Sequence, residues 1–199
     1  MTSSTSRAPS VIVVTGPSGA GKGTLIREVL SRVSGAAAAV SATTRDRRPG
    51  EQDGREYHFL GLAEFLDLIE RGEFLEQVTY VSGHRYGTLR SELDRLRSEG
   101  RVPLLELETE GALRVKREVP GAVTIFISAR VEELERRLRE RATESTGEIG
   151  ERIALARHQL EQADEFDYIV ENDELDRAVE ELTELVRGLL SGVGTMARP

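Results

Sequence analysis

Short apolar runs alternate with amphipathic stretches along most of the chain. Val11 to Val14 is continuously apolar, as in strands buried within a parallel sheet, and apolar residues from Leu25 to Val33 repeat at the spacing of one helix face. Further strand candidates are residues 36–40, 102–107, 123–128 and 168–170, and further helix candidates are 111–118, 131–141, 149–162 and 175–190. This alternation predicts an α/β fold in which helices flank a parallel sheet.

The alternation is interrupted between residues 41 and 91. Hydroxyl and arginine residues fill positions 41–50, and the pattern then predicts a strand at 57–60, a helix at 62–69, an extended piece at 74–81 and a turn at 82–87. We therefore expect a small mixed α+β lobe, residues 41–91, inserted into a core formed by 9–40 and 92–190. Residues 1–8 and 191–199 are expected to be flexible tails.

The composition narrows the classes of function. The chain has 199 residues, no cysteine, three histidines and a formal net charge of -8. A general nucleic-acid binder needs a net basic face, so we expect no nucleic-acid partner. Without cysteine there is neither a disulfide framework nor a Cys-based metal site, and any metal is expected to arrive with a ligand. No signal peptide or membrane span is predicted, which favours the cytoplasm.

The segment after the first strand has the pattern of a phosphate-binding loop. Gly16, Gly21 and Lys22 meet the spacing G-x-x-x-x-G-K between a strand and a helix. Glycines let backbone N–H groups point inward, the positive end of the helix faces the same spot, and lysine adds a cation. The bland alternative is a glycine-rich turn with an incidental lysine. The residues expected to hold a nucleotide triphosphate are Gly16, Pro17, Ser18, Gly19, Ala20, Gly21, Lys22, Gly23 and Thr24.

A second group of candidate anion ligands lies in the interrupting region. Arginine forks and phenolic hydroxyls bind phosphate, although the same residues read alone also fit a solvated charged loop. A phosphate loop together with a second arginine cluster suits phosphoryl transfer between two anions, where cations and alignment matter more than a general base. This cluster comprises a loop, expected at residues 41–50, with Ser41, Thr43, Thr44, Arg45, Arg47 and Arg48, and two tyrosines expected in strands or turns of the same lobe, Tyr57 and Tyr86.

Several separate segments together make the chain resemble the guanylate kinase family, from Val11 to about Leu190. The residues 16–22 resemble the family's phosphate loop. Ser41 to Arg45, followed by Arg48, Gly50-Glu51, Gly54 and Tyr57, resemble its GMP-binding signature, and Phe74-Leu75-Glu76 and Tyr86-Gly87-Thr88 resemble the rest of that pocket. The resemblance implies transfer of the γ-phosphoryl group of ATP to GMP, giving ADP and GDP, with Mg²⁺. It also implies ATP and GMP, or dGMP, as partners.

The resemblance assigns the acceptor pocket residue by residue. The GMP phosphate would be held by Arg45, Arg48, Tyr57 and Tyr86, and the base would be surrounded by Ser41, Glu76, Thr88 and one of Glu106 or Glu108. Guanine presents N–H donors that a carboxylate accepts and an O6 that a hydroxyl can reach, whereas adenine presents the opposite edge. A carboxylate left unpaired by adenine is costly, so strong discrimination is expected.

The donor side and a lid are assigned in the same way. A polar link between two charged helices predicts a mobile lid at residues 137–153. The resemblance places Arg137, Arg141 and Arg152 at its border, near the donor and transferred phosphates, and Asn172-Asp173 near the adenine of ATP; the alternatives are a solvated helix face and a helix cap. The catalytic set expected is Lys22, Arg45, Arg141 and Arg152.

Two departures from the family pattern concern the metal. Gly23 stands where Ser or Thr usually ligates Mg²⁺, so that contact falls to Thr24, to Glu108 through water, or to water alone. Glu106 and Glu108 replace a pair of aspartates, which leaves open which of them faces the base and which the metal.

Two other readings compete with a guanylate kinase. One is a non-catalytic guanylate-kinase-like module that binds phosphorylated peptides, and the other is a related kinase of the same fold that acts on another monophosphate. The retained Lys22 and loop glycines argue against the first, and Glu76 with both tyrosines argues against the second. A monomer or a weak homo-oligomer is expected.

Overall fold

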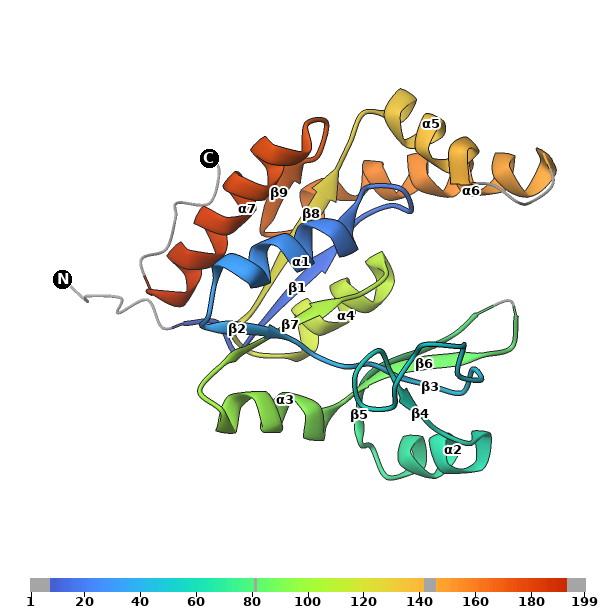
Figure 1. Cartoon of the computed structure of the whole chain (residues 1–199), viewed down its shortest axis with the longest axis vertical. Coiled ribbons are helices and arrows are strands. Elements are labelled where there is room, and N and C mark those ends of the chain that lie inside the picture. Colours follow the sequence, from blue (N-terminus) through green and yellow to red (C-terminus); the bar gives the residue numbers. More distant parts are fainter. Residues whose placement is uncertain (1–7, 81, 142–145, 193–199) are drawn as a thin grey trace.

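A five-stranded parallel sheet forms the centre of the fold (Figure 1). The computed structural model describes residues 8–80, 82–141 and 146–192, apart from the side chains of 141 and 146–148. The strand order is β2-β7-β1-β8-β9, and every neighbouring pair is parallel. The strands are β1 (Val11–Thr15), β2 (Ala36–Ala38), β7 (Val102–Glu106), β8 (Ala122–Ser128) and β9 (Tyr168–Glu171).

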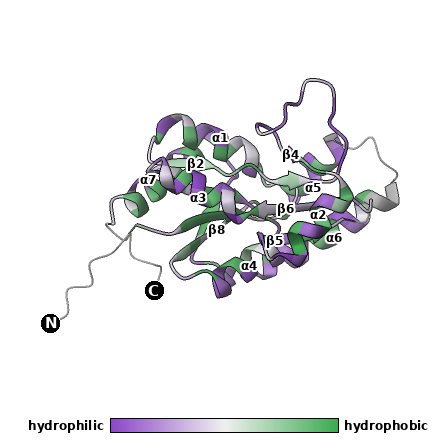
Figure 2. Ribbon diagram, turned by 90° about the horizontal axis from the view of Figure 1, so that it is seen from below, coloured by the Kyte–Doolittle hydropathy of each residue, from purple (hydrophilic) through white to green (hydrophobic). Residues whose placement is uncertain are grey.

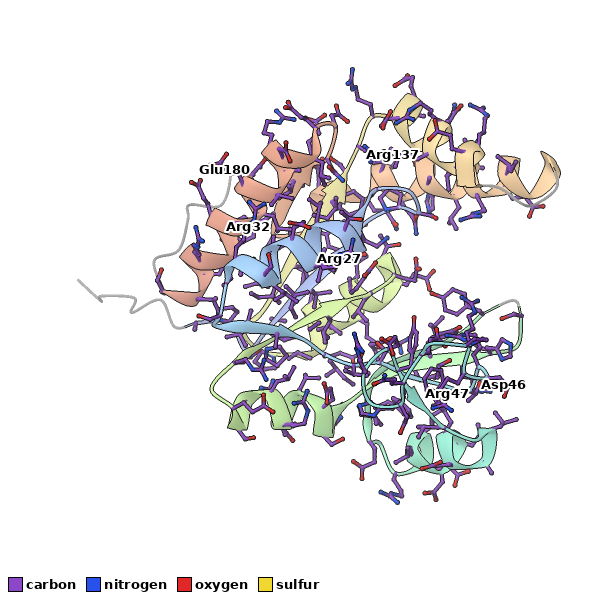
Figure 3. All side chains as sticks on the ribbon, viewed as in Figure 1. Arg27, Arg32, Asp46, Arg47, Arg137 and Glu180 are labelled. Carbon is purple, nitrogen blue, oxygen red and sulfur yellow. The ribbon has the colours of Figure 1, made fainter. Side chains whose placement is uncertain are left out.

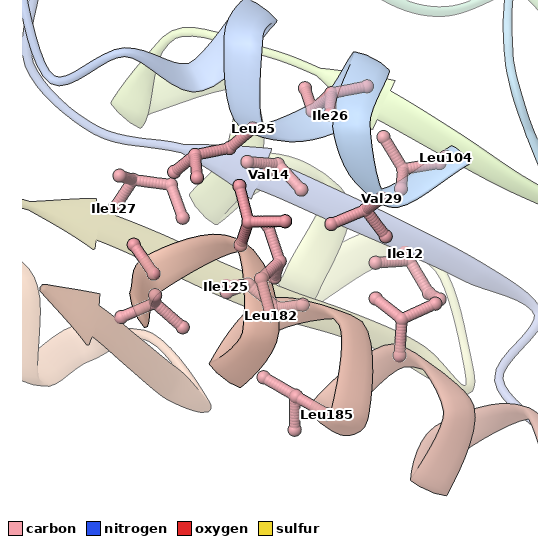
Figure 4. Close-up of a cluster of buried hydrophobic side chains, with 14 of the residues drawn as sticks. Ile12, Val14, Leu25, Ile26, Val29, Leu104, Ile125, Ile127, Leu182 and Leu185 are labelled. Atoms are coloured by element: carbon pink, nitrogen blue, oxygen red, sulfur yellow. The ribbon is translucent and has the colours of Figure 1, made fainter. Parts of the chain in front are cut away.

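Helices cover both faces of this sheet because its strands are apolar on both sides. In β1, Ile12 and Val14 face a core shared with α1 (Lys22–Arg32) and α7 (Leu175–Leu190), shown in Figure 4. Val11 and Val13 face the opposite core, shared with α3 (Arg90–Ser98) and α4 (Thr109–Glu118). Figure 2 shows β8 as hydrophobic, whereas α4 and α6 carry both kinds of residue. The predicted α/β class with helices flanking a parallel sheet is confirmed.

Two further helices follow β8 along one end of the molecule. They are α5 (Val131–Arg141) and α6 (Thr146–Glu161), which pack against each other, and the short 3-10 turn η1 (Ala163–Glu165) leads from α6 to β9. The middle of the predicted lid, residues 142–145, lies outside the described residues, so the lid stays a prediction. In the part of the chain that the structure describes, no helix is long and apolar enough to cross a bilayer.

A second, mixed sheet is built from the region between β2 and α3. Its order is β4-β3-β6-β5, with β3 (Ala42–Thr43), β4 (His58–Phe59), β5 (Phe74–Thr79) and β6 (Arg85–Leu89). The helix α2 (Leu62–Glu70) covers it, and Phe65 stacks on Phe74 with ring centroids 4.4 Å apart.

Two local predictions in this region are wrong. Ala42–Thr43 forms a strand where a loop was expected, and Arg85 to Gly87 belong to β6 rather than to a turn. The reason is pairing between segments far apart in sequence: β3 pairs with both β4 and β6, and β6 pairs with β5. Strands of two residues carry no periodicity of their own, so only these partners define them.

The chain crosses between the two sheets twice, at residues 39–41 and at the junction of β6 with α3. The buried carboxylate of Glu92, in α3, connects these crossings. It accepts a hydrogen bond from the backbone N–H of Val40 at 3.0 Å, and Arg95 donates to both of its oxygens at 2.8 and 2.9 Å. His58 Nε2 of the second sheet lies 3.8 Å from the same carboxylate. The crossings are therefore bonded to each other.

Gly16, which follows β1, cannot carry a side chain in this fold. Its φ is +138°, and a Cβ would lie 2.2 Å from the backbone oxygen of Ile127 in β8. We expect Gly16→Ala to lower the free energy of unfolding by about 3 kcal/mol, measured by urea denaturation. Gly150→Ala, in the second turn of α6 with no atom of another element within 4 Å of the added methyl, should instead raise it by about 0.5–1 kcal/mol. Equal effects of the two variants would contradict this account.

Candidate active site

A cleft of ≈ 820 Å³ separates the carboxyl ends of the parallel strands from the second sheet. Because both the loop after β1 and the residues after β7 open onto this edge, side chains far apart in sequence meet there. Predicted site residues that line the cleft are Lys22, Ser41, Tyr57, Glu76, Tyr86, Glu106 and Glu108. The two predicted anion sites thus belong to one cavity.

The loop between β1 and α1 has the geometry of a phosphate cradle. Gly16, Gly19 and Gly21 all have positive φ, and the N-cap of α1 is Gly21, with no side chain capping the first turn. The N-terminal amide groups of α1 therefore remain available to an anion, and the helix dipole favours one there.

Hydrogen bonds hold Lys22 against this loop. Its ammonium donates hydrogen bonds to the backbone oxygens of Gly16, at 2.7 Å, and of Pro17, at 3.2 Å. The cation therefore already lies inside the turn that would surround a phosphate.

Asn172 and Arg137 donate hydrogen bonds to the backbone of the phosphate loop. The buried Asn172 amide donates to the backbone oxygen of Ala20 at 2.7 Å, and Arg137 donates to the backbone oxygens of Gly19 at 3.3 Å and of Asn172 at 3.1 Å. Figure 3 shows Arg137 between α5 and this loop. Both residues thus contact the loop that the sequence linked with ATP.

Asp173 bonds to Arg130, which precedes α5, and not to the phosphate loop. Its carboxylate accepts from the backbone N–H of Arg130 at 2.9 Å and lies 2.6 Å from the Arg130 guanidinium. The alternative of a helix cap is wrong, since the N-cap of α7 is Glu174, which makes no side-chain cap bond.

Glu106 and Glu108 diverge although they are two residues apart. Glu106 ends β7, beside Lys22, and its Oε2 lies 3.5 Å from where a Cβ on Gly23 would be. Glu108 is the N-cap of α4 and accepts a hydrogen bond from the Tyr80 hydroxyl at 3.1 Å. One carboxylate therefore faces the phosphate loop, and the other faces the second sheet. Desolvation raises the pKa of Glu106, and Lys22 opposes that shift.

Glu76 and Thr88 form a buried polar pair on adjacent strands of the second sheet. The Thr88 hydroxyl donates to Glu76 Oε1 at 2.8 Å, and both side chains are less than a tenth exposed. Burial raises the pKa of Glu76, although hydrogen bonds from Thr88 oppose it. A buried carboxylate with spare acceptor capacity at the wall of a cleft suits a ligand with N–H donors.

The arginine cluster is ordered around Arg45. Its guanidinium donates to Glu51 Oε1 at 2.8 Å, which raises the pKa of Arg45, and lies 5.5 Å from the ring centre of Tyr57. The rings of Tyr57 and Tyr86 pack edge to face at 5.8 Å, and burial raises the pKa of Tyr57. A cation and two phenols therefore converge on one patch of the second sheet.

The remaining predicted residues divide between the two sides. Arg152, in α6, reaches the phosphate loop and donates to the Ser18 hydroxyl at 3.1 Å. Thr24 lies in the first turn of α1, and Arg48 is exposed, with its backbone N–H bound to Glu51 at 2.8 Å. Arg141 ends α5, but its side chain lies outside the description.

Three residues of the site were not predicted from the sequence. Tyr80 bonds Glu108 and packs on Tyr86 with ring centres 5.0 Å apart, and burial and Glu108 raise its pKa. Glu51 holds Arg45, and Arg114 of α4 lines the cleft and acts electrostatically on Glu76. Only Glu51, within the family signature, had a signal in the sequence.

Comparison with known proteins decides the family. The family model described as Guanylate kinase matches residues 8–189. The chain belongs to the guanylate kinase family. The guanylate kinase of Rubrobacter xylanophilus is 46% identical over 187 residues, which cover 94% of this chain and 97% of that protein. That of Thermotoga maritima is 43% identical over 178 residues, which cover 89% and 86%.

A solved guanylate kinase structure has the same fold. The crystal structure of guanylate kinase from Anaplasma phagocytophilum aligns with a TM-score of 0.69 at 27% sequence identity, covering 92% of this chain and 87% of that one. The resemblance drawn from the motifs to the guanylate kinase family is confirmed, while the roles of single residues stay predictions.

Proposed function

We propose that the chain transfers the γ-phosphoryl group of ATP to GMP, giving ADP and GDP, and that the two walls of the cleft bind the two substrates. The chain is an ATP-dependent nucleoside monophosphate kinase. The observation that carries the proposal is the meeting in one cleft of Lys22 on the phosphate loop and the Glu76–Thr88 pair on the second sheet.

The donor half comprises the phosphate loop and the arginines around it. Lys22 and the first amide groups of α1 would bind the β- and γ-phosphates of ATP, and Arg152 would bind the transferred phosphoryl group. Arg137 and Asn172 would act by holding the loop, since their hydrogen bonds go to its backbone oxygens. Arg141 is kept in the catalytic set as a prediction from the family resemblance.

The acceptor half is the second sheet. Arg45, Arg48, Tyr57 and Tyr86 would bind the GMP phosphate; Arg45 would exchange its bond with Glu51 for the anion. Glu76 would accept from the guanine N1–H and N2–H₂ groups, and the hydroxyls of Ser41 and Thr88 would face O6. The acceptor phosphate is already ionised, so no general base is required.

Mg²⁺ would enter the site with ATP and neutralise phosphate charge during transfer. No group of three or more His, Asp or Glu residues that could hold an ion alone exists among the residues that the structure describes. The oxygen donors near the loop nevertheless suit Mg²⁺, because the Glu106 carboxylate and the Thr24 residue lie beside the start of α1. Nucleotide phosphates would supply the remaining ligands.

The proposal is tested by comparing GMP, dGMP, AMP and UMP as acceptors with ATP and Mg²⁺ in a coupled ADP-release assay. GMP is expected to be the best acceptor by kcat/KM, with dGMP next. Activity with AMP equal to or above that with GMP would refute the assignment of the base site. Tight binding of a phosphopeptide without any ATP turnover would instead favour the non-catalytic module.

GMP binding should weaken in acid because of Glu76. Guanine needs the ionised carboxylate as an acceptor, and the raised pKa of Glu76 keeps more of this group protonated at mildly acidic pH. We therefore expect the ratio of GMP affinities, wild type over Glu76→Gln, to fall as the pH is lowered from about 8 to about 5. The ratio removes the titration of the GMP phosphate itself, near pH 6. A ratio independent of pH, measured by calorimetry, would contradict this role.

A further inference from the structure

Gly23 differs from the other glycines of the phosphate loop. Gly16, Gly19 and Gly21 have positive φ, whereas Gly23 does not, so the backbone at this position accepts any residue. Outside its own helix, the described atom that a Cβ added here would meet within 4 Å is Oε2 of Glu106, at 3.5 Å. On the side away from α1, the space beside Gly23 is therefore bounded by a carboxylate.

This position is usually filled by a metal ligand. In loops of the spacing G-x-x-x-x-G-K, the residue after the lysine is Ser or Thr, whose hydroxyl contacts Mg²⁺. Here that hydroxyl is missing, and Glu106 projects into the same space from the end of β7, where it is paired in register with Val14 of β1. A carboxylate oxygen is also a ligand that Mg²⁺ prefers.

The Glu106 carboxylate has no hydrogen bond or ion pair with any residue whose side chain the structure describes, although the Lys22 ammonium acts on it electrostatically. Glu108, by contrast, is bonded to Tyr80. Of the two carboxylates, only Glu106 is free to turn toward a ligand on the phosphate loop.

We infer that Gly23 and Glu106 are a matched pair, in which the Glu106 carboxylate takes the place of the missing hydroxyl and faces the Mg²⁺ of ATP, directly or through a water molecule. This inference rests on the proposed function. The Cβ of a serine at position 23 would be in ordinary contact with Glu106 Oε2, so it is the serine hydroxyl that would compete with the carboxylate for this space, and the shorter aspartate at 106 would leave room for it. The two positions can change together but not singly.

The test is a double-mutant cycle on metal affinity, without turnover. Mn²⁺, which takes the same oxygen ligands as Mg²⁺, is titrated into the ADP complex of each full-length variant and followed by electron paramagnetic resonance. We expect Glu106→Asp alone to weaken Mn²⁺ binding about tenfold and Gly23→Ser alone to weaken it as well. The Mn²⁺ affinity of the double variant should return to within about threefold of the wild-type value. Glu106→Asp should therefore weaken Mn²⁺ binding when residue 23 is glycine and strengthen it when residue 23 is serine.

Two further variants test whether the charge of Glu106 matters and whether shortening any glutamate has the same effect on Mn²⁺ binding. Glu106→Gln keeps the length and removes the charge, so it should also weaken Mn²⁺ binding. Glu118→Asp, the same shortening at the end of α4, should change nothing. Affinity for GMP without metal is expected to be the same throughout the set.

Three outcomes would overturn the pairing. The first is additive effects of Gly23→Ser and Glu106→Asp. The second is tighter Mn²⁺ binding by Gly23→Ser alone. The third is a loss of GMP affinity in Glu106→Asp with Mn²⁺ binding unchanged, which would assign Glu106 to the base. A wild-type protein that bound neither ATP nor ADP would instead overturn the proposed function, and the two failures are thus distinguishable.

Discussion

Replacing Lys22 by alanine should lower kcat by about 10²- to 10³-fold while GMP still binds. The ammonium lies within the phosphate loop, bonded to two of its backbone oxygens, where it can pass to the β- and γ-phosphates of ATP as charge develops. Loss of one preorganised charge donor in a water-poor site has an effect of this size. Single-turnover kinetics with saturating GMP measure it.

The matched control for this variant is Lys116→Ala, which removes the other lysine of the chain. Lys116, in α4, bonds the Glu165 backbone oxygen at 2.8 Å and pairs with Asp167 at 2.8 Å, away from the cleft lining. Its loss should leave kcat unchanged. An unchanged kcat in Lys22→Ala would contradict a role for the phosphate loop in the reaction. Weaker binding of GMP by Lys22→Ala would show that the lysine contacts the acceptor nucleotide.

Removing the charge of Glu76 should strongly reduce the preference of the enzyme for GMP over AMP. We expect Glu76→Gln to lower kcat/KM for GMP by about 10²-fold, because an amide cannot accept both N–H donors of guanine and the site loses a charged, buried acceptor. Activity with AMP should not fall, since adenine never used the carboxylate. The ratio of kcat/KM values for GMP and AMP is the measurement.

Two variants accompany this experiment. Thr88→Val removes the hydroxyl that bonds Glu76, and it should reduce the same ratio less than Glu76→Gln does. Glu73→Gln makes the identical chemical change just before β5, at a carboxylate near the surface that pairs with Arg71 at 3.3 Å, and should have no effect on it. A parallel fall of GMP and AMP activity in Glu76→Gln would indicate damage to the pocket rather than a change of specificity.

Local patterns in the sequence were sufficient for the larger sheet and the phosphate loop. The helix at 175–190 begins and ends where its periodicity predicts, and Gly16, Gly19 and Gly21 have the positive φ that a tight cradle requires. Both depend on interactions within one segment and its immediate neighbours. A periodic helix and a loop with fixed glycine spacing can therefore be recognised from their own residues.

In the second sheet, local patterns did not predict the strands correctly, because those strands depend on pairing between segments far apart in the sequence. The strand Ala42–Thr43 exists because β4 and β6 lie on either side of it, and neither partner is visible in two residues of sequence. The divergence of Glu106 and Glu108 has a similar cause. Residues two apart would share a face in a continuing strand, but the strand ends at Glu106, and Glu108 already begins a helix.

The connection between the two sheets limits how the second one can move. The chain crosses at residues 39–41 and again between β6 and α3, and the buried Glu92 carboxylate bonds the first crossing to the helix that begins at the second. The second sheet is also held by packing, because Leu75 of β5 is buried in the same cluster as Ala112 and Val115 of α4. Rotation about the line through the two crossings is the motion that the backbone connections oppose least, and the packing of β5 on α4 would set where that rotation stops, which would return the acceptor to the same alignment with the phosphate loop.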